Sequence, residues 1–167
     1  MYAEDKLFHV EAYTLARKVK IIPDIVFYHL VVPGSLSQGY RKNHFEMSKE
    51  LYSRIKALLD NNYDEKVIDD YCSKIPNIIG ASMLNMCKCG FCEAKENMRN
   101  ILEDSFVKES YKVKYHKTDY FRYWILYKIG NLGSTTLVVI SAKLMLLSNP
   151  VYRFLQRKEE YKKINNI

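Results

Sequence analysis

The residues of this chain that are suited to chemistry lie in its first forty positions. Glu4 and Asp5 form an acidic pair at the start of a predicted helix, where the helix dipole favours the ionised carboxylate. An ionised carboxylate in this place suits a general base that removes a proton from a hydroxyl group. It equally suits a helix cap that contributes only stability, and the residue types alone favour the cap.

A histidine and a group of hydroxyl residues follow the acidic pair. His29 lies in the apolar run 25–32, where a lone histidine is more often structural than a metal ligand. The loop after the run carries four further polar residues: Ser35, Ser37, Tyr40 and Arg41. An arginine matches the geometry of a phosphate, so this loop predicts either a diphosphate contact or an ordinary surface turn.

The elements that would position these groups are one helix and two short strands. The pattern predicts a helix over 4–17 and strands over 19–22 and 25–32, separated by Pro23 and Asp24. Pro33 and Gly34 end the second strand. Three such elements bury too little apolar surface to form a stable unit on their own.

The middle of the chain has the period of helices. An amphipathic stripe predicts a helix from residue 43 to the Asn61-Asn62 pair. A second helical run covers about 64–86 and is expected to break or kink at Pro76, and a third covers about 91–106. Short connections between them predict a small antiparallel bundle.

The last third is basic and aromatic. From residue 107 onward the chain has twelve Lys or Arg and four Asp or Glu, whereas the rest has fourteen and fifteen. The apolar stretch 132–147 is shorter than the roughly 20 residues that a spanning helix needs. Its aliphatic density argues against nucleic acid and indicates an anionic membrane surface, with a core helix or a dimer contact as equal alternatives.

The first 42 residues resemble the C-terminal half of family 2 glycosyltransferases. The similarity lies in Tyr-Ala-Glu-Asp-Lys-Leu-Phe from residue 2, the strand about a dozen residues on, and the loop ending Ser-Leu-Ser at residues 35–37. The resemblance implies a GT-A fold that binds a nucleotide-sugar, with Asp5 as the base for inverting transfer and Glu4 as its neighbour. It also implies a glycan or lipid-linked acceptor, and His29 near the metal or pyrophosphate.

Three departures from the family pattern affect what the resemblance implies. Ala3 stands where the family usually has Gly, and Leu30 stands where many members have Arg. The family's Asp-x-Asp motif, which holds a divalent Mn or Mg ion across the diphosphate, does not occur in this sequence. The sequence is therefore expected to be a truncated or separate C-terminal portion that is inactive on its own.

Four cysteines indicate reduced thiols, and the charged N-terminus predicts no signal peptide, so a cytoplasmic location at the inner face of the membrane is expected. Cys72, Cys87, Cys89 and Cys92 contain a single Cys-x2-Cys pair, which is weak support for zinc. Exposed apolar faces of a partial fold would make self-association plausible.

The sequence as a whole predicts an α+β, mainly α fold in three parts. These are a C-terminal piece of a GT-A sheet at 1–42, a helical bundle at 43–106 and a basic helical tail at 107–167. The first functional hypothesis is the acceptor-side fragment of a bacterial polysaccharide glycosyltransferase. The alternative is a non-catalytic helical module that binds a membrane surface or a protein partner.

Overall fold

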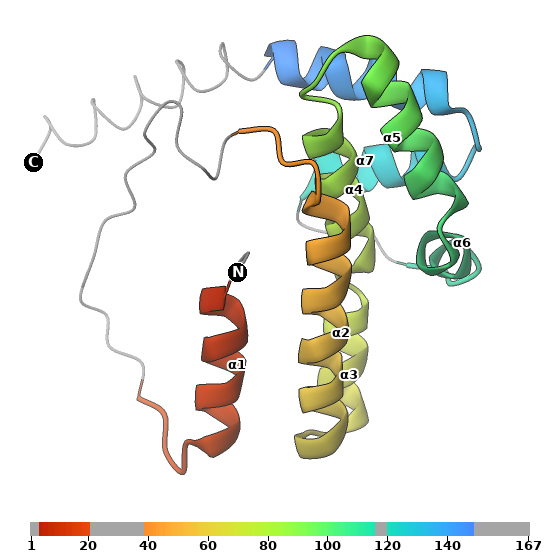
Figure 1. The fold of residues 1–167 in the computed structure, drawn as a ribbon. Helices are drawn as coiled ribbons and strands as arrows, with labels where there is room; N and C mark the ends of the chain where they lie inside the picture. The colour runs from red at the N-terminus through yellow and green to blue at the C-terminus, as the bar shows by residue number, and fades with distance from the viewer. Residues whose placement is uncertain (1–3, 21–38, 116–119, 149–167) are drawn as a thin grey trace, which may run out of the picture.

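The computed structural model describes residues 4–20, 39–115 and 120–148 of the 167-residue chain. Its helices, in chain order, are α1 (Glu4–Leu15), α2 (His44–Asn62), α3 (Glu65–Cys72), α4 (Ile75–Met86), α5 (Phe91–Glu103), α6 (Ser105–Tyr111) and α7 (Phe121–Gly130) (Figure 1). A further helical stretch covers residues 135–148.

The expected α+β fold class, with its piece of a GT-A sheet, is wrong. The ranges 4–20, 39–115 and 120–148 contain no strand, and residues 19 and 20, which were to begin the first strand, are not part of one. The remainder of that strand and the whole run 25–32 lie outside the described residues. A helix satisfies its own backbone hydrogen bonds, whereas a strand needs a neighbouring edge, and the described part of the chain offers none.

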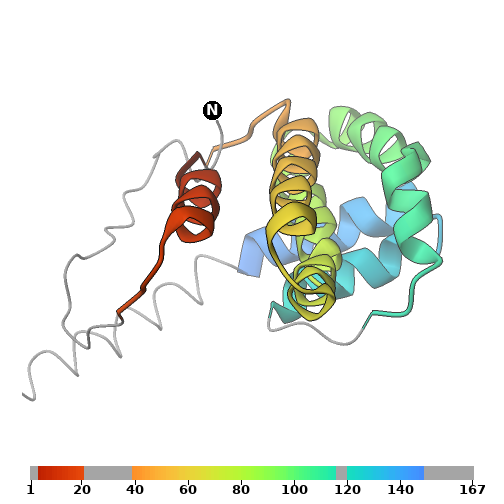
Figure 2. The ribbon, with the colours of Figure 1, turned by 90° about the horizontal axis from the view of Figure 1, so that it is seen from below.

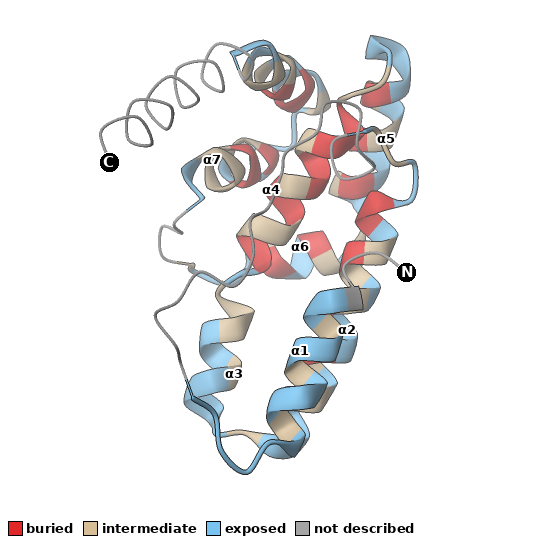
Figure 3. Cartoon of the chain, turned by 90° about the vertical axis from the view of Figure 1, so that its left-hand side faces the viewer, coloured by how far each residue is buried: buried red, intermediate tan, exposed pale blue. Residues whose placement is uncertain are grey.

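Helix α4 is the centre of the fold. Its sequence, IPNIIGASMLNM, is apolar on most sides, as is typical of a helix that others surround. Ile79 and Met83 are fully buried, and Figure 3 shows buried residues running along α4. Helices α2, α5, α6 and α7 all pack against α4. The buried core therefore belongs to the bundle, whereas α1 and α3 are mostly exposed (Figure 3).

Pro76 separates two helices, as predicted for the run 64–86. Helix α3 ends at Cys72, and Pro76 lies in the first turn of α4, where its missing N–H leaves no helical hydrogen bond unmade. The run 91–106 also divides, which the sequence interpretation did not foresee. Helix α5 ends at Glu103, and the Asp104 side chain accepts a hydrogen bond from the Phe106 N–H to begin α6.

The C-terminal described part is a helical hairpin. Gly133, with a φ of 74°, lies in the turn between α7 and the helix 135–148. That helix buries Val138, Val139 and Ala142 and exposes Leu137, Ile140, Leu144 and Leu147 on another side. None of the described helices combines the length and the apolar character needed to span a membrane.

Helix α1 lies beside α2, on the side away from the rest of the bundle, in both ribbon views (Figures 1 and 2). Leu7 and Val10 are half-buried, whereas the apolar side chains of Phe8 and Leu15 are 65% and 84% exposed. The contact with α2 is narrow, and it determines where the acidic pair lies.

Candidate functional site

The acidic pair begins α1, as its sequence position predicted. Glu4 is the first residue of the helix, and the Asp5 side chain is exposed. Both residues therefore belong to the first turn, where unpaired backbone N–H groups and the helix dipole favour a negative charge. This position is compatible with either a cap or a base that meets a ligand from solvent.

Tyr40 and Arg41 are held by helices α4 and α5. The Tyr40 hydroxyl donates to Glu93 Oε1 over 2.9 Å and accepts from Asn97 Nδ2 over 3.1 Å. Desolvation, and then the bond to Glu93, raise the pKa of Tyr40. The Arg41 backbone N–H donates to Asn85 Oδ1 over 3.1 Å. These contacts hold the residues that precede α2 against α4 and α5. They do not place Tyr40 beside α1.

The other predicted site residues, Ser35, Ser37 and His29, lie outside the described residues. Their roles toward a diphosphate or a metal stay predictions.

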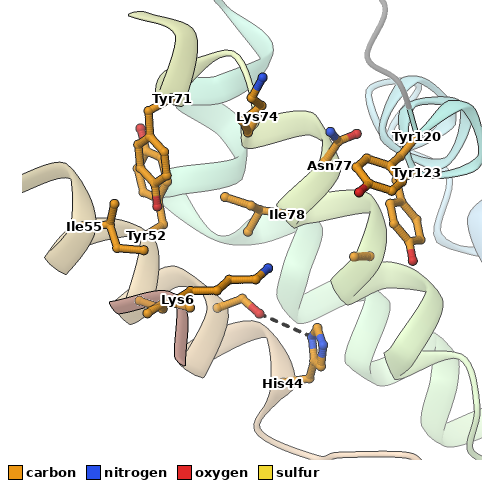
Figure 4. Close-up of a pocket in the computed structure, with 13 residues that line it drawn as sticks. Lys6, His44, Tyr52, Ile55, Tyr71, Lys74, Asn77, Ile78, Tyr120 and Tyr123 are labelled. Atoms are coloured by element: carbon orange, nitrogen blue, oxygen red, sulfur yellow. Dashed lines mark hydrogen bonds between the residues drawn. The ribbon is translucent and has the colours of Figure 1, made fainter. Parts of the chain in front are cut away.

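A pocket of about 460 Å³ lies between α1, α2, the end of α3, α4 and the start of α7 (Figure 4). It is the feature that the sequence interpretation missed. Its apolar lining residues are Leu51, Ile55, Ile78 and Ala81, and its aromatic ones are Tyr52, Tyr71, Tyr120 and Tyr123. Its polar lining residues are Lys6, His44, Ser48, Lys74 and Asn77. Lys6 follows Asp5 in α1 and lines the pocket, whereas Asp5 is not among the lining residues.

His44 is a buried imidazole in the wall of this pocket. Its Nδ1 lies 3.2 Å from Ser82 Oγ and 3.5 Å from Ser48 Oγ. Burial, and then the positive charges of Lys88 and Arg41, lower the pKa of His44 to about 4. The imidazole is therefore neutral at physiological pH and is held by two hydroxyl groups. This arrangement suits a structural role better than a general base.

Two pairs of tyrosines stand at opposite ends of the pocket. The rings of Tyr52 and Tyr71 stack with centroids 5.2 Å apart and an interplanar angle of 8°. The rings of Tyr120 and Tyr123 lie 5.8 Å apart at 28°. Desolvation raises the pKa of both Tyr52 and Tyr71 well above the ordinary value, so neither phenol ionises at neutral pH.

The cysteines do not assemble a metal site in the described part of the chain. No group of three or more His, Cys, Asp or Glu side chains gathers there with the geometry to hold an ion. Cys87 is buried, and desolvation raises the pKa of its thiol to about 12, which disfavours the thiolate that zinc needs. Cys92 is exposed on α5.

The sequence signals for the pocket were present but dispersed. Tyr52 and Ile55 belong to the stripe that predicted α2, and Tyr71 and Ile78 to the run that predicted α3 and α4. In the sequence these positions could not be distinguished from core residues. Helical periodicity identifies the apolar side of a helix, but it does not show which other helix that side faces.

Comparisons of the chain with models of protein families, with curated proteins and with solved structures found no match. The resemblance to family 2 glycosyltransferases therefore rests on the residues of the sequence alone.

Proposed function

We propose that this chain is the acceptor-side part of a family 2-like glycosyltransferase. The observation that carries the proposal is the acidic pair in the first turn of an exposed helix, whose next residue, Lys6, lines a pocket of ligand size. The order of this pair, the apolar run and the Ser-Leu-Ser loop in the sequence supports it.

In this reaction Asp5 acts as the base. Its carboxylate takes the proton of an acceptor hydroxyl while the hydroxyl oxygen attacks the anomeric carbon of a nucleotide-sugar. The bond between that carbon and the phosphate oxygen breaks, and the nucleoside diphosphate leaves with inversion. A first-turn position suits the role, because the N-terminal end of a helix favours negative charge and the exposure of Asp5 leaves it open to the acceptor.

The described residues form no site for the divalent Mn or Mg ion that the family uses. Ranges 4–20, 39–115 and 120–148 bring no three metal-ligating side chains together, and His29 lies outside them. The proposal includes a class of acceptor, which is a glycan or a lipid-linked saccharide. It also includes a location at the inner face of a membrane.

The first test is the DNA upstream of the Met1 codon. A reading frame there, intact or shifted, that encodes a nucleotide-binding half with Asp-x-Asp supports the proposal. A genuine start at Met1 with no such sequence upstream contradicts it.

The second test uses the restored full-length enzyme. Asp5→Asn is expected to lower sugar transfer by about 10²- to 10⁴-fold, since it removes the base. Glu11→Gln, which changes another exposed carboxylate of α1, is the matched control and should leave transfer unchanged. The 167-residue chain alone is expected to form no product. Equal activity of the Asp5→Asn and Glu11→Gln enzymes would overturn the role of Asp5.

A second candidate function is a helical module that binds an anionic membrane surface without catalysis. It is favoured by the apolar stripe on the helix 135–148, where Leu144 and Leu147 are 61% and 72% exposed. The sequence that follows the stripe carries five Lys or Arg and two Glu. Apolar side chains next to cationic ones are typical of helices that lie in the headgroup layer.

Flotation with vesicles tests this surface. Leu144→Glu should reduce binding to anionic vesicles several-fold, while Asn100→Glu, which adds the same charge on α5, should not. Equal binding of both variants would contradict the stripe as the lipid contact. Both functions are compatible with lipid binding, so the upstream DNA remains the measurement that separates them.

A further inference from the structure

The pocket beside α1 has an apolar floor. Leu51 and Ile55 contribute to it from α2, and Ile78 and Ala81 from α4. Its volume of about 460 Å³ lies within the range of roughly 300 to 1,000 Å³ that small-molecule sites occupy. Apolar side chains around a space of this size favour the burial of a hydrocarbon part of a ligand, because each buried methylene contributes about 0.8 kcal/mol.

The end of the pocket formed by Tyr52 and Tyr71 offers carbon surface and few free donors. The Tyr52 hydroxyl donates to Cys72 Sγ over 3.3 Å, and its ring is stacked on Tyr71. His44 is engaged with the Ser82 hydroxyl. Because these polar groups already have partners inside the protein, they leave the pocket poorly equipped for a ligand with many hydroxyl groups.

One cation at the pocket is uncompensated within the described residues. Lys6 extends from α1 into the pocket (Figure 4). It makes no hydrogen bond or ion pair with any residue of 4–20, 39–115 or 120–148, whereas the other lysine of the pocket, Lys74, pairs with Asp70 over 3.3 Å. A single ammonium group at the edge of apolar surface favours a ligand with one anionic group.

We propose that this pocket binds an amphipathic anion, namely one alkyl or prenyl chain that ends in a phosphate or a carboxylate. The chain lies on Leu51, Ile55 and Ile78, and the anionic group meets Lys6. The proposal goes beyond the glycosyltransferase function and does not depend on it, because it uses neither Asp5 nor a sugar.

Titration calorimetry with octyl phosphate, kept below its micelle concentration, tests the proposal without a membrane. Octyl phosphate is expected to bind, whereas octanol and inorganic phosphate bind at least tenfold more weakly, because each has only half of the required chemistry. Octanoate in a parallel titration distinguishes a carboxylate ligand from a phosphate ligand, and tighter binding of either one supports the proposal. Failure of both octyl anions to bind would overturn it.

Two variants locate the binding. Lys6→Gln should weaken octyl phosphate about fivefold, and Lys18→Gln, an exposed lysine that does not line the pocket, should not. Ala81→Leu fills the floor and should weaken both octyl anions at least tenfold, with Ser53→Leu on the exposed side of α2 as its control. Circular dichroism checks that each variant is folded. Unchanged affinity in Lys6→Gln, or in a folded Ala81→Leu, would overturn the assignment.

Discussion

Gly80 of α4 lies directly against the backbone of Tyr123 in α7. A Cβ atom placed on Gly80 would be 2.1 Å from the Tyr123 carbonyl oxygen and 2.7 Å from its Cα. The two helices therefore approach through backbone rather than through side chains, which requires a residue without a side chain on α4. This contact determines how α7, and with it Tyr120 and Tyr123, lies beside the pocket.

Gly80→Ala is expected to lower the free energy of unfolding by about 3 kcal/mol or more. Intrinsic helix propensity favours Ala over Gly by about 1 kcal/mol, so a net loss isolates the clash with the α7 backbone. Urea unfolding measures it. Gly39→Ala is the control, since a Cβ there meets nothing within 4 Å. Equal stability of the two variants would show that the α4–α7 crossing relaxes freely.

The buried His44 makes stability depend on pH. Above pH 6.5 the imidazole is neutral in both the folded and the unfolded chain. As the pH falls from 6.5 to about 4, the unfolded chain takes up the proton and the folded chain does not, so stability decreases through this window. At about 1.4 kcal/mol per pKa unit, the loss is expected to reach about 3 kcal/mol.

Urea unfolding at several pH values measures this dependence. His44→Gln should be less stable at neutral pH but should show a shallower decrease between pH 6.5 and about 4. His9→Gln, which removes an exposed imidazole on α1, should follow the wild-type curve. Parallel curves for His44→Gln and the wild type would assign the pH dependence to other groups.

Asp104 has two structural roles at the α5–α6 junction. Its Oδ1 accepts from the Phe106 N–H over 2.8 Å, and its Oδ2 pairs with Lys49 of α2 over 2.7 Å. Asp104→Ala is expected to cost about 1 to 2 kcal/mol, mostly from the lost cap. Asp60→Ala, which removes only the exposed pair with Lys56, should cost clearly less than Asp104→Ala in the same thermal melts.

A substitution at Gly133 measures the cost of backbone strain alone, because an added Cβ atom would meet no neighbouring atom. The φ of 74° at this residue disfavours residues with a Cβ, although nothing lies within 4 Å of that position. Gly133→Ala should therefore lower stability by about 1 kcal/mol, and Gly133→Asn should lose less, because Asn tolerates the left-handed region. If Ala and Asn lose the same amount, the turn is not limited by this dihedral angle.

The helices were predictable where apolar spacing and a stop signal agree. The stripe that includes Tyr52 and Ile55 predicted α2 to its last residue, and Pro76 predicted the division between α3 and α4. The break at Asp104 was missed because the apolar period continues through Phe106, while the cap depends on a single side chain. Residues 19 and 20 were predicted to begin a strand from their β propensity. That propensity reflects how well a side chain fits a half-buried sheet surface, and a neighbouring strand must supply that surface.

The candidate site was predictable in part. Asp5 lies in the first turn of a helix, as its neighbours indicated. Tyr40 was assigned to a ligand from its place near the Ser-Leu-Ser loop, yet its hydroxyl is engaged by Glu93 and Asn97, partners more than fifty positions away in the chain. Contacts of that separation leave no local pattern in the sequence, and the same is true of the pocket.

Trp124 gives α7 an optical signal of its own. It is the single tryptophan of the sequence, stacked on Phe121 with centroids 6.5 Å apart and with Lys128 Nζ 5.4 Å from its ring. Its indole N–H is buried and has no hydrogen-bond partner among the described residues. Fluorescence excited in the indole band consequently reports the surroundings of one helix, one residue from the crossing at Gly80. Separation of α7 from α4 should therefore appear as a red shift before the remaining helices unfold.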